Sequence, residues 1–283
     1  MARFIAKLSG MCTLLPGGPT FCLHLRDLSE RNKGLMKSPN LLLPLLAAFG
    51  FAVPAIAGHF TLDTESGSVW VDRADVRIPG DTGTPFSMTD DLSADDPQAY
   101  IRLRGTWEIN ERHEITALWA PLSFDFAGAF DRPIAFDGTQ FAEGRATTGS
   151  YRFNSYRLSY RYNFITNENL KFGLGLTAKV RDAEIALQQG SLSESDSNVG
   201  VVPLINFKLD WRIAPQWHLL VDGDALGASQ GHAVDVGVGL QYMATENLGL
   251  RLGYRILDGG ADNDDVYTFA RFQYAMAGVT WRF

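Results

Sequence analysis

Ser155-Tyr156-Arg157-Leu158-Ser159-Tyr160-Arg161-Tyr162-Asn163-Phe164 alternates without a break between polar and apolar side chains. Every second residue is Tyr, Leu or Phe, and the residues between them are Ser, Arg or Asn. A period of two is typical of a β-strand, because successive side chains of a strand point to opposite faces. Residues 155–164 therefore predict a strand with one apolar face and one polar face.

The same alternation recurs along much of the chain. Six further segments show it: residues 101–109, 170–181, 205–213, 217–222, 234–242 and 248–256. Their second face carries charged residues and many glycines. In a soluble sandwich the apolar face packs inward, whereas in a membrane barrel it meets lipid and the polar face meets the lumen. Alternation alone does not separate these two architectures.

The connections between the predicted strands alternate between short and long. Short ones lie at residues 110–112, 166–168, 214–216 and 245–247, and longer ones at 79–96, 128–149, 190–197, 227–231 and 258–265. Short turns at one end and longer loops at the other are typical of a membrane barrel. Four turns and five loops predict ten strands. Eight or twelve stay open, because the first strand, around Ser68–Ile78, and the segment after Pro121 alternate less cleanly.

Aromatic residues gather near the short turns. The set consists of Trp107, Phe164, Trp211, Trp217, Tyr242 and Trp281. Aromatic girdles mark the level where a barrel wall passes from lipid to water. We interpret this set as such a girdle, with ordinary core residues as the alternative.

The chain ends Gly278-Val279-Thr280-Trp281-Arg282-Phe283. This ending resembles the terminal strand of bacterial outer-membrane β-barrels, which finish with aromatic-x-Phe and a glycine a few residues earlier; Met276 departs from the pattern. The resemblance implies an all-β, antiparallel, up-and-down transmembrane barrel in a Gram-negative envelope, in contact with lipid and lipopolysaccharide. It also implies that the barrel assembly machinery reads Gly278, Trp281 and Phe283 as an insertion signal. It selects no characterised subfamily.

The N-terminal region predicts export. A basic start at Met36-Lys37 precedes an apolar run over 41–53 and then Pro54-Ala55-Ile56-Ala57, which is the pattern of a signal peptide cut before Gly58. A membrane anchor is the alternative. Residues 1–35 show no periodicity, and we interpret them as a mis-annotated, disordered upstream extension. The predicted domains are therefore 1–35, a signal peptide over 36–57, and a barrel over 58–283.

Charge and cysteine content narrow the options. Six of the 25 basic and two of the 32 acidic residues precede Gly58, so the mature chain has 19 basic and 30 acidic residues, a net charge of −11. An acidic protein argues against nucleic acid as a partner. Both cysteines, Cys12 and Cys22, also precede the cut, which excludes a disulfide framework in the mature chain. Only residues 41–57 form a long apolar stretch, so a bundle of membrane helices is excluded.

The polar faces predict a charged lumen. The expected lumen or solute-binding residues are Arg102, Arg104, Arg157, Arg161, Lys179, Arg251, Arg255, Asp222, Asp224 and Asp235, with Lys171, Arg181, Lys208, Arg212, Glu108 and Asp210 beside them. One interpretation is a network of ion pairs that plugs the barrel. The other is a narrow passage or small pocket that prefers anions. The predicted loops carry mostly acids instead, so a basic lumen is expected beneath acidic loops.

Candidate catalytic and metal sites are weak. Asp222, Asp224, His232 and Asp235 could approach one another as in omptin proteases, but the second acidic pair of that class is not evident. The acids at 262–265 lack the spacing of a calcium loop. No metal-ligand cluster, nucleophile elbow or phosphate loop occurs, so no metal and no cofactor are expected.

The functional expectation is a non-enzymatic barrel of the outer membrane, either a structural envelope component or a narrow porin-like passage for small, anionic solutes. Two alternatives stay open. One is surface binding or adhesion through the extracellular loops, chiefly 128–149. The other is an outer-membrane hydrolase, omptin-like or lipid A-modifying. The sequence leaves the oligomeric state undetermined.

The predicted cleavage site is directly testable. N-terminal sequencing of the mature protein isolated from membranes should begin at Gly58, because the small residues Ala55 and Ala57 precede it in the positions that a signal peptidase requires. A first residue well upstream of Gly58 would contradict this prediction.

Overall fold

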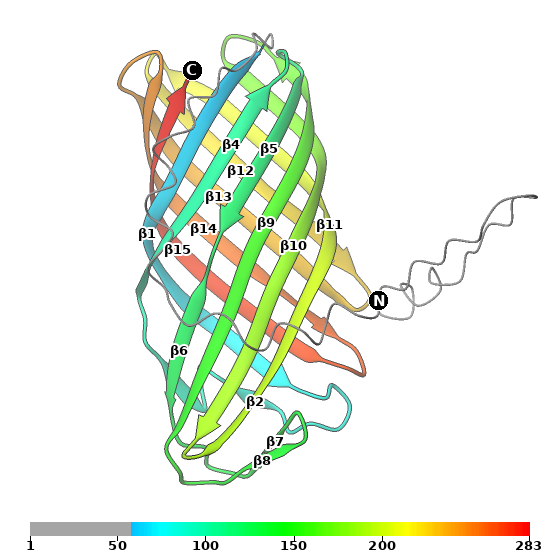
Figure 1. The fold of residues 1–283 in the computed structure, drawn as a ribbon. Helices are drawn as coiled ribbons and strands as arrows, with labels where there is room; N and C mark the ends of the chain where they lie inside the picture. The colour runs from blue at the N-terminus through cyan, green and yellow to red at the C-terminus, as the bar shows by residue number, and fades with distance from the viewer. Residues whose placement is uncertain (1–57) are drawn as a thin grey trace, which may run out of the picture. The chain divides into compact units, whose positions relative to one another are not determined.

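A computed structural model describes residues 58–283 (Figure 1). The predicted upstream extension, the signal peptide, Ala55 and Ala57 lie outside the described residues. Within residues 58–283 no helix is long and apolar enough to cross a membrane. The wall consists of ten long strands: β1 (His59–Arg77), β4 (Gln98–Glu108), β5 (His113–Ala120), β9 (Thr147–Thr166), β10 (Leu170–Gln189), β11 (Leu192–Ala214), β12 (Trp217–Ala228), β13 (Gly231–Met243), β14 (Leu248–Asp262) and β15 (Tyr267–Arg282).

The last strand pairs with the first and closes the wall. β15 is antiparallel to β1, with Leu62 opposite Trp281. Just beyond it, the N–H of Phe283 donates to the C=O of Phe60 at 2.8 Å, and the two rings lie 5.9 Å apart. The other long strands pair with their neighbours in chain order. The predicted ten-stranded antiparallel barrel is therefore confirmed.

The two ends of the barrel differ in their connections. At the end where β1 begins and β15 finishes, here the short-turn end, turns join the strands at 109–112, 167–169, 215–216 and 244–247, close to the predicted positions. At the opposite, long-loop end, residues 78–97 form the first long connection. β6 (Ser123–Gly128) continues the course of β5 after a break at Pro121, and residues 129–146 form the second long connection.

Several predicted boundaries were wrong. The first strand begins at His59 and not near Ser68, β11 begins at Leu192, and β14 continues to Asp262. The predicted loops 190–197 and 258–265 are therefore mostly strand. These segments are rich in Ser, Asp, Asn and Gly. They belong to hairpins that extend beyond the lipid, and a strand whose two faces both meet water needs no alternation of apolar residues. The loop prediction followed composition, whereas backbone pairing to the neighbouring strand decides the structure.

A tight turn lies inside the second long connection. Phe136-Asp137-Gly138-Thr139 forms the turn between β7 (Ile134–Phe136) and β8 (Thr139–Phe141). Asp137 and Gly138 have φ angles of 44° and 80°. Two consecutive positive φ values are what a two-residue hairpin turn of this kind requires, and Asp-Gly adopts them readily.

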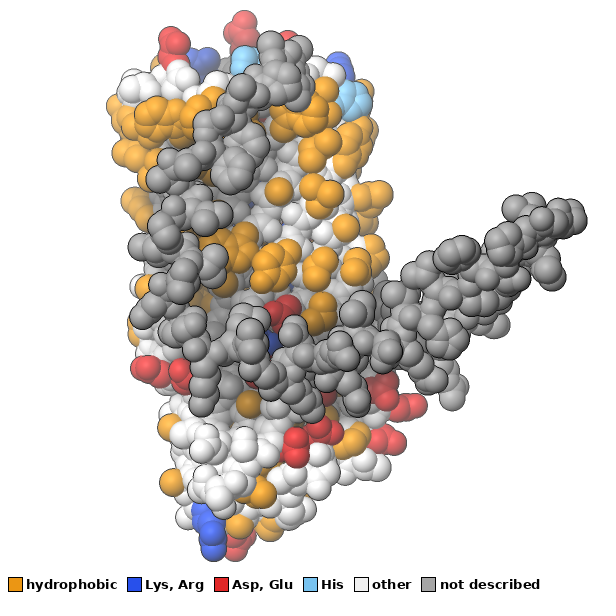
Figure 2. All heavy atoms as spheres, in the orientation of Figure 1, with side chains coloured by type: hydrophobic (Ala, Val, Ile, Leu, Met, Phe, Trp, Pro, Cys, Tyr) orange, Lys and Arg blue, Asp and Glu red, His pale blue; other side chains and the backbone are white. Residues whose placement is uncertain are grey.

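Outward-facing apolar side chains form a belt on the barrel wall, and Figure 2 shows part of it on one face. Leu158, Leu176 and Leu252 are 59%, 70% and 70% exposed, which is the surface expected of strands that face lipid. At the short-turn end the predicted aromatic set bounds this belt. Phe164, Trp211, Trp217 and Trp281 are exposed, Tyr242 packs on Trp217, and Trp107 is half-buried.

A second aromatic level bounds the belt toward the long-loop end, and the sequence did not reveal it. Trp119, Tyr156 and Tyr254 point outward and are each at least 40% exposed, and Trp70 lies 6.5 Å from the ring of Tyr254. Tyr156 and Tyr254 lie well inside their strands and Trp119 lies beside the break at Pro121, so nearness to a short turn gave no signal. Two aromatic levels are typical of a membrane barrel.

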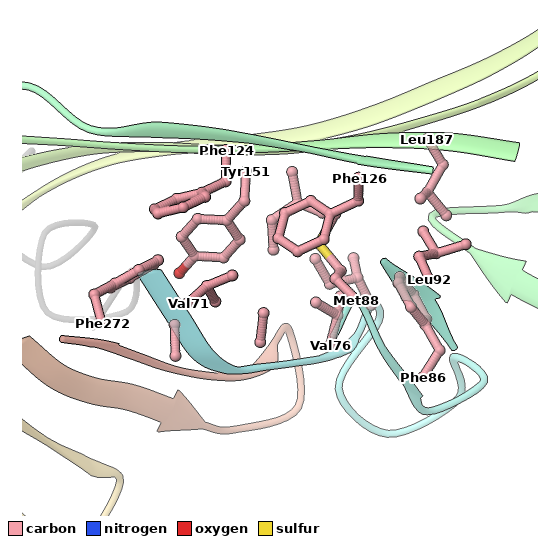
Figure 3. Packing of buried hydrophobic residues seen from close by; sticks show 14 of the residues in the cluster. Val71, Val76, Phe86, Met88, Leu92, Phe124, Phe126, Tyr151, Leu187 and Phe272 are labelled. Carbon is pink, nitrogen blue, oxygen red and sulfur yellow. The ribbon is translucent and has the colours of Figure 1, made fainter. Parts of the chain in front are cut away.

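Apolar side chains fill the long-loop half of the interior (Figure 3). Phe272 of β15 stacks on Phe124 of β6 with ring centroids 5.4 Å apart. The short strands β2 (Phe86–Ser87) and β3 (Leu92–Ala94) add Phe86 and Leu92. We call this core the apolar cap; its members include Val71, Val76, Phe86, Met88, Leu92, Phe124, Phe126, Tyr151, Leu187 and Phe272.

An ion pair joins the two long connections over the apolar cap. The guanidinium of Arg132 donates to both oxygens of Asp91, at 2.8 and 2.9 Å, and to the C=O of Pro85 at 3.0 Å. Burial alone would raise the pKa of the Asp91 carboxyl, but the bonds from Arg132 and from the Ser87 N–H outweigh burial and hold this pKa below its usual value. Asp91 therefore stays ionised and keeps the two connections together.

Removing a ring from the apolar cap should destabilise the whole barrel. Phe272→Ala is expected to lower the free energy of unfolding by about 3–5 kcal/mol, because a buried ring is lost and a cavity stays behind. Urea unfolding of the refolded protein, followed by tryptophan fluorescence, measures this. Leu192→Ala, at an exposed hairpin tip, is the control and should change the stability by less than about 0.5 kcal/mol. Equal effects of the two variants would contradict the assigned core.

Acid should loosen the two long connections. Because the folded-state pKa of Asp91 lies below its unfolded value, the stability it adds is complete above about pH 4 and is lost as pH falls through the folded pKa. Amide hydrogen exchange of residues 86–94 and 130–136, corrected for intrinsic rates, should show falling protection below pH 4. Arg132→Gln should lower this protection already at pH 7. Identical exchange in both proteins at both pH values would refute the role of this pair.

Candidate functional site: the charged lumen

The short-turn half of the interior is polar and charged. At its centre Arg255 of β14, which is 1% exposed, donates to Glu65 at 3.1 Å, to Asp222 at 3.0 Å and to Asp235 at 2.7 Å. Arg102 of β4 also reaches Asp235, at 3.0 Å. These side chains come from β1, β4, β12, β13 and β14, so one buried network joins half of the wall. We call it the charged network.

Two carboxylates lie directly opposite each other in this network. Asp224 on β12 pairs in register with Asp235 on β13, and both side chains point inward. Like charges in such a cross-strand pair repel. Arg157 of β9, on a distant part of the wall, crosses the lumen and donates to both carboxylates. A cation from far away in the sequence therefore neutralises a repulsion that the hairpin creates.

A second cluster lies nearer the short turns. Glu114 of β5 accepts from Arg161, from Asn163 at 2.8 Å and from Lys171 at 2.5 Å. Lys171 also reaches Glu108 at 2.9 Å. Arg161 donates to Asn206 at 2.8 Å, and the Asn206 amide donates to Asp224 at 2.9 Å. These two bonds link the second cluster to the charged network.

The ten predicted lumen residues all point inward, and their role as solute ligands stays a prediction. Two further predicted members lie at the two ends of the barrel and not in this network. Arg181 has the inward register of Lys179 but bonds Asn198 beyond the level of the apolar belt, and Arg212 is exposed at the short-turn end. Lys179 is 3% exposed, and its amine lies over the ring of Phe153, 4.6 Å from the centroid.

Sequence reasoning missed three acids of the lumen, namely Asp63, Glu65 and Glu114. The first two were lost because the first strand was placed too late; a period-two reading that began at His59 would have found them. With these acids included, the lumen is nearly balanced and not strongly basic. Its inward cations are Arg102, Arg104, Arg157, Arg161, Lys171, Lys179, Lys208, Arg251 and Arg255, and its inward anions are Asp63, Glu65, Glu108, Glu114, Asp210, Asp222, Asp224 and Asp235.

A small cavity lies where the charged network meets the apolar cap. It measures about 10 Å³, and its lining includes Tyr100, Arg102, Pro121, Arg157 and Tyr274. Such a volume holds about one water molecule. A larger solute could occupy this part of the lumen only if buried side chains moved.

The residues considered for acid–base catalysis do not form one site. Asp222, Asp224 and Asp235 are buried and engaged by arginines. His232 lies three residues before Asp235 on β13 and therefore on the outward face, where its Nε2 is 3.6 Å from Asp258 Oδ2. Within residues 58–283 no three His, Cys, Asp or Glu side chains are placed to hold a metal ion.

Comparison with known proteins bears on the fold. No family model and no curated protein matches this chain. The outer-membrane protease OmpT from Escherichia coli aligns with a TM-score of 0.51 and 11% identity, over 81% of this chain and 98% of OmpT. The chain has the fold of an outer-membrane β-barrel. The resemblance seen in Gly278, Trp281 and Phe283 is thereby confirmed at the level of fold, and no characterised subfamily is established.

Two other outer-membrane barrels align at lower scores. The translocator domain of the autotransporter NalP from Neisseria meningitidis has a TM-score of 0.42 and 12% identity, over 80% of this chain and 88% of that one. Ail, the attachment invasion locus protein of Yersinia pestis, has a TM-score of 0.38 and 14% identity, over 80% and 99%. At such identities the likeness extends to the fold alone, and the protease activity is a property of OmpT.

The central arginine should be essential for the stability of this barrel. Arg255→Met removes the shared partner of Glu65, Asp222 and Asp235 and is expected to lower the free energy of unfolding by about 3–5 kcal/mol. Arg212→Met, at an exposed position, is the matched control and should stay within about 0.5 kcal/mol. Urea unfolding in lipid vesicles compares the two. Similar small losses would show that the network adds little to stability.

Proposed function

We propose that this protein is a structural, non-conducting barrel of the outer membrane of a Gram-negative cell, without enzymatic activity. The observation that carries this proposal is that two different fillings occupy the interior in series. The charged network occupies the short-turn half, and the apolar cap occupies the long-loop half. A passage would have to displace both fillings.

The proposal places the short-turn end in the periplasm and the long-loop end outside the cell. Short periplasmic turns and longer extracellular loops are the rule for such barrels. The predicted signal peptide and cleavage before Gly58 would bring the chain to the periplasm. There the barrel assembly machinery would read Gly278, Trp281 and Phe283. The hydrogen bond from Phe283 to Phe60 supports a role of this strand in closing the sheet.

Lipid and lipopolysaccharide are the partners expected at the outer boundary of the apolar belt. Outward charges begin there. Arg271 pairs with Asp258 at 3.1 Å and with Asp72 at 3.6 Å, and Arg73 pairs with Asp75 at 2.5 Å. Charged side chains are unfavourable in hydrocarbon, so this row marks the level at which the wall leaves the lipid. Headgroup phosphates would lie beside it.

An enzymatic role is not part of the proposal. A general acid or base must be free to exchange a proton with a substrate. Asp222, Asp224 and Asp235 are each held by buried arginines, and His232 faces away from them.

Conductance in a planar lipid bilayer tests the proposal. The purified barrel is expected to be silent at voltages where a general porin, measured in the same bilayer, gives discrete steps. Silence follows from the two fillings, charged side chains and then apolar ones, that occupy the interior in series. Discrete, anion-selective steps would overturn the proposal and favour the porin-like alternative.

A further inference from the structure

Strand β11 is paired along its whole length on one side only. On the β10 side the register runs from Leu192 opposite Gln189 to Trp211 opposite Leu170. On the β12 side the pairing begins at Ile205, opposite Ala225. Residues 192–204 therefore have no strand partner on that side within the described part of the chain. We call this side of residues 192–204 the free edge of β11. β12 and β13 end in a hairpin at 229–230, well before β10 and β11 do (Figure 1).

The backbone shows which groups this free edge presents. The N–H of Arg212 donates to Asn169, on the β10 side. Alternate residues of a strand direct their N–H and C=O groups to opposite sides. The odd-numbered residues therefore face away from β10. Ser193, Ser195, Ser197, Val199 and Val201 carry these N–H groups.

The free edge lies beyond the apolar belt. Val199 is in register with Asp182 of β10, and Asp182 and Glu184 form outward ion pairs with Arg152 of β9. Such charges mark the water side of the boundary. Pro203, an odd-numbered residue, has no N–H, so the donor is missing where the edge comes closest to lipid. From Pro203 toward Leu192 no strand among the described residues covers the edge and no further proline interrupts it, and of its N–H groups that of Ser195 donates to the Glu194 carboxylate at 3.1 Å.

The side chains along this edge indicate which strand would fit beside it. On the outward face Val199 and Val201 are 69% and 59% exposed. On the inward face the carboxylate of Asp196 makes no hydrogen bond or ion pair with the described residues, and burial together with the nearby Asp137 raises the pKa of this carboxyl. A neighbouring strand with apolar residues on one face and a cation on the other would cover the valines and neutralise Asp196.

A second copy of this barrel is a poor occupant. Strands of membrane barrels tilt by about 35–45°. Two copies in one membrane, related by an axis along the membrane normal, would bring their β11 edges together crossed by roughly twice that tilt. Ladder hydrogen bonds need nearly parallel or antiparallel strands. A flexible segment of another polypeptide has no such restriction.

We propose that the free edge of β11, over residues 192–201, binds an extended polypeptide segment of alternating apolar and basic residues as an added β-strand. Main-chain hydrogen bonds to the odd-numbered residues hold the segment, and Asp196 selects the basic side chains. The inference relies on the proposed function only for placing this edge outside the cell. The strand addition itself can be tested on the isolated barrel.

The test uses the refolded barrel in lipid nanodiscs and three synthetic nine-residue peptides. The first alternates Val and Lys, the second replaces Lys by Glu, and the third is the first peptide with methylated backbone nitrogens. Binding is measured by fluorescence anisotropy, and amide hydrogen exchange by NMR. The Val/Lys peptide should bind and should slow exchange at Ser197, Val199 and Val201. The Glu peptide should bind at least tenfold more weakly, and the methylated peptide should not bind.

Variants separate backbone from side-chain effects. Val199→Pro removes one edge N–H and should weaken the Val/Lys peptide by about threefold to tenfold, whereas Val199→Ala keeps the N–H and should bind more tightly than the proline variant. Asp196→Asn should weaken the Lys peptide and narrow its advantage over the Glu peptide. Circular dichroism and unfolding of each variant establish that it is folded.

Three outcomes would overturn the inference. These are failure of the Val/Lys peptide to bind at millimolar concentration, equal binding of the methylated peptide, and protection of the odd-numbered amides of Ser197, Val199 and Val201 already without peptide. None of these outcomes depends on conductance. A barrel that conducts ions, but whose edge amides become protected only when the Val/Lys peptide is added, would refute the proposed function and leave the strand-addition site standing.

Discussion

Closure of the sheet between β1 and β15 is the constraint on which the rest of this structure depends. In hydrocarbon an unpaired N–H or C=O has no water to bond, so a sheet that crosses a membrane has to return to its own first strand. The register of Leu62 with Trp281, followed by the bond from Phe283 to Phe60, meets this requirement. β11 lacks a strand partner only on its β12 side and only over residues 192–204, which lie beyond the apolar belt toward the long loops. There water or another polypeptide can bond the free N–H and C=O groups.

Closure also creates an interior that needs filling. Ten strands enclose a narrow space, and each strand sends every second side chain into it. Near the short turns those side chains are charged, and each buried charge needs a partner. Arg157 and Arg255 supply such partners across the lumen to acids that adjoin each other on β12 and β13. Toward the long loops the same space is filled by rings such as Phe124 and Phe272.

The sequence predicts the wall better than its contents. Period-two alternation and short turns are local, so the ten strands and the inward position of Arg102 or Asp235 could be derived from residue order alone. The pairing of Arg157 with Asp235 could not, because it joins residues 78 positions apart whose distance depends on closure. Asp63 and Glu65 were missed because Ser66-Gly67-Ser68 interrupts the alternation of β1, although pairing to β15 keeps that segment in the strand. The apolar cap was not foreseen, because its members lie in loops and strand ends without a common period.

Closure itself can be measured by crosslinking, since the described chain contains no cysteine. Thr64 on β1 lies opposite Val279 on β15, and both side chains face outward. The double variant Thr64→Cys with Val279→Cys, refolded in lipid and treated with a short thiol crosslinker, should give a circular product that migrates differently after full unfolding. Thr64→Cys with Ala275→Cys, four residues out of register, should give little product. Absence of the first crosslink, or equal yields from the two pairs, would contradict a barrel closed in this register.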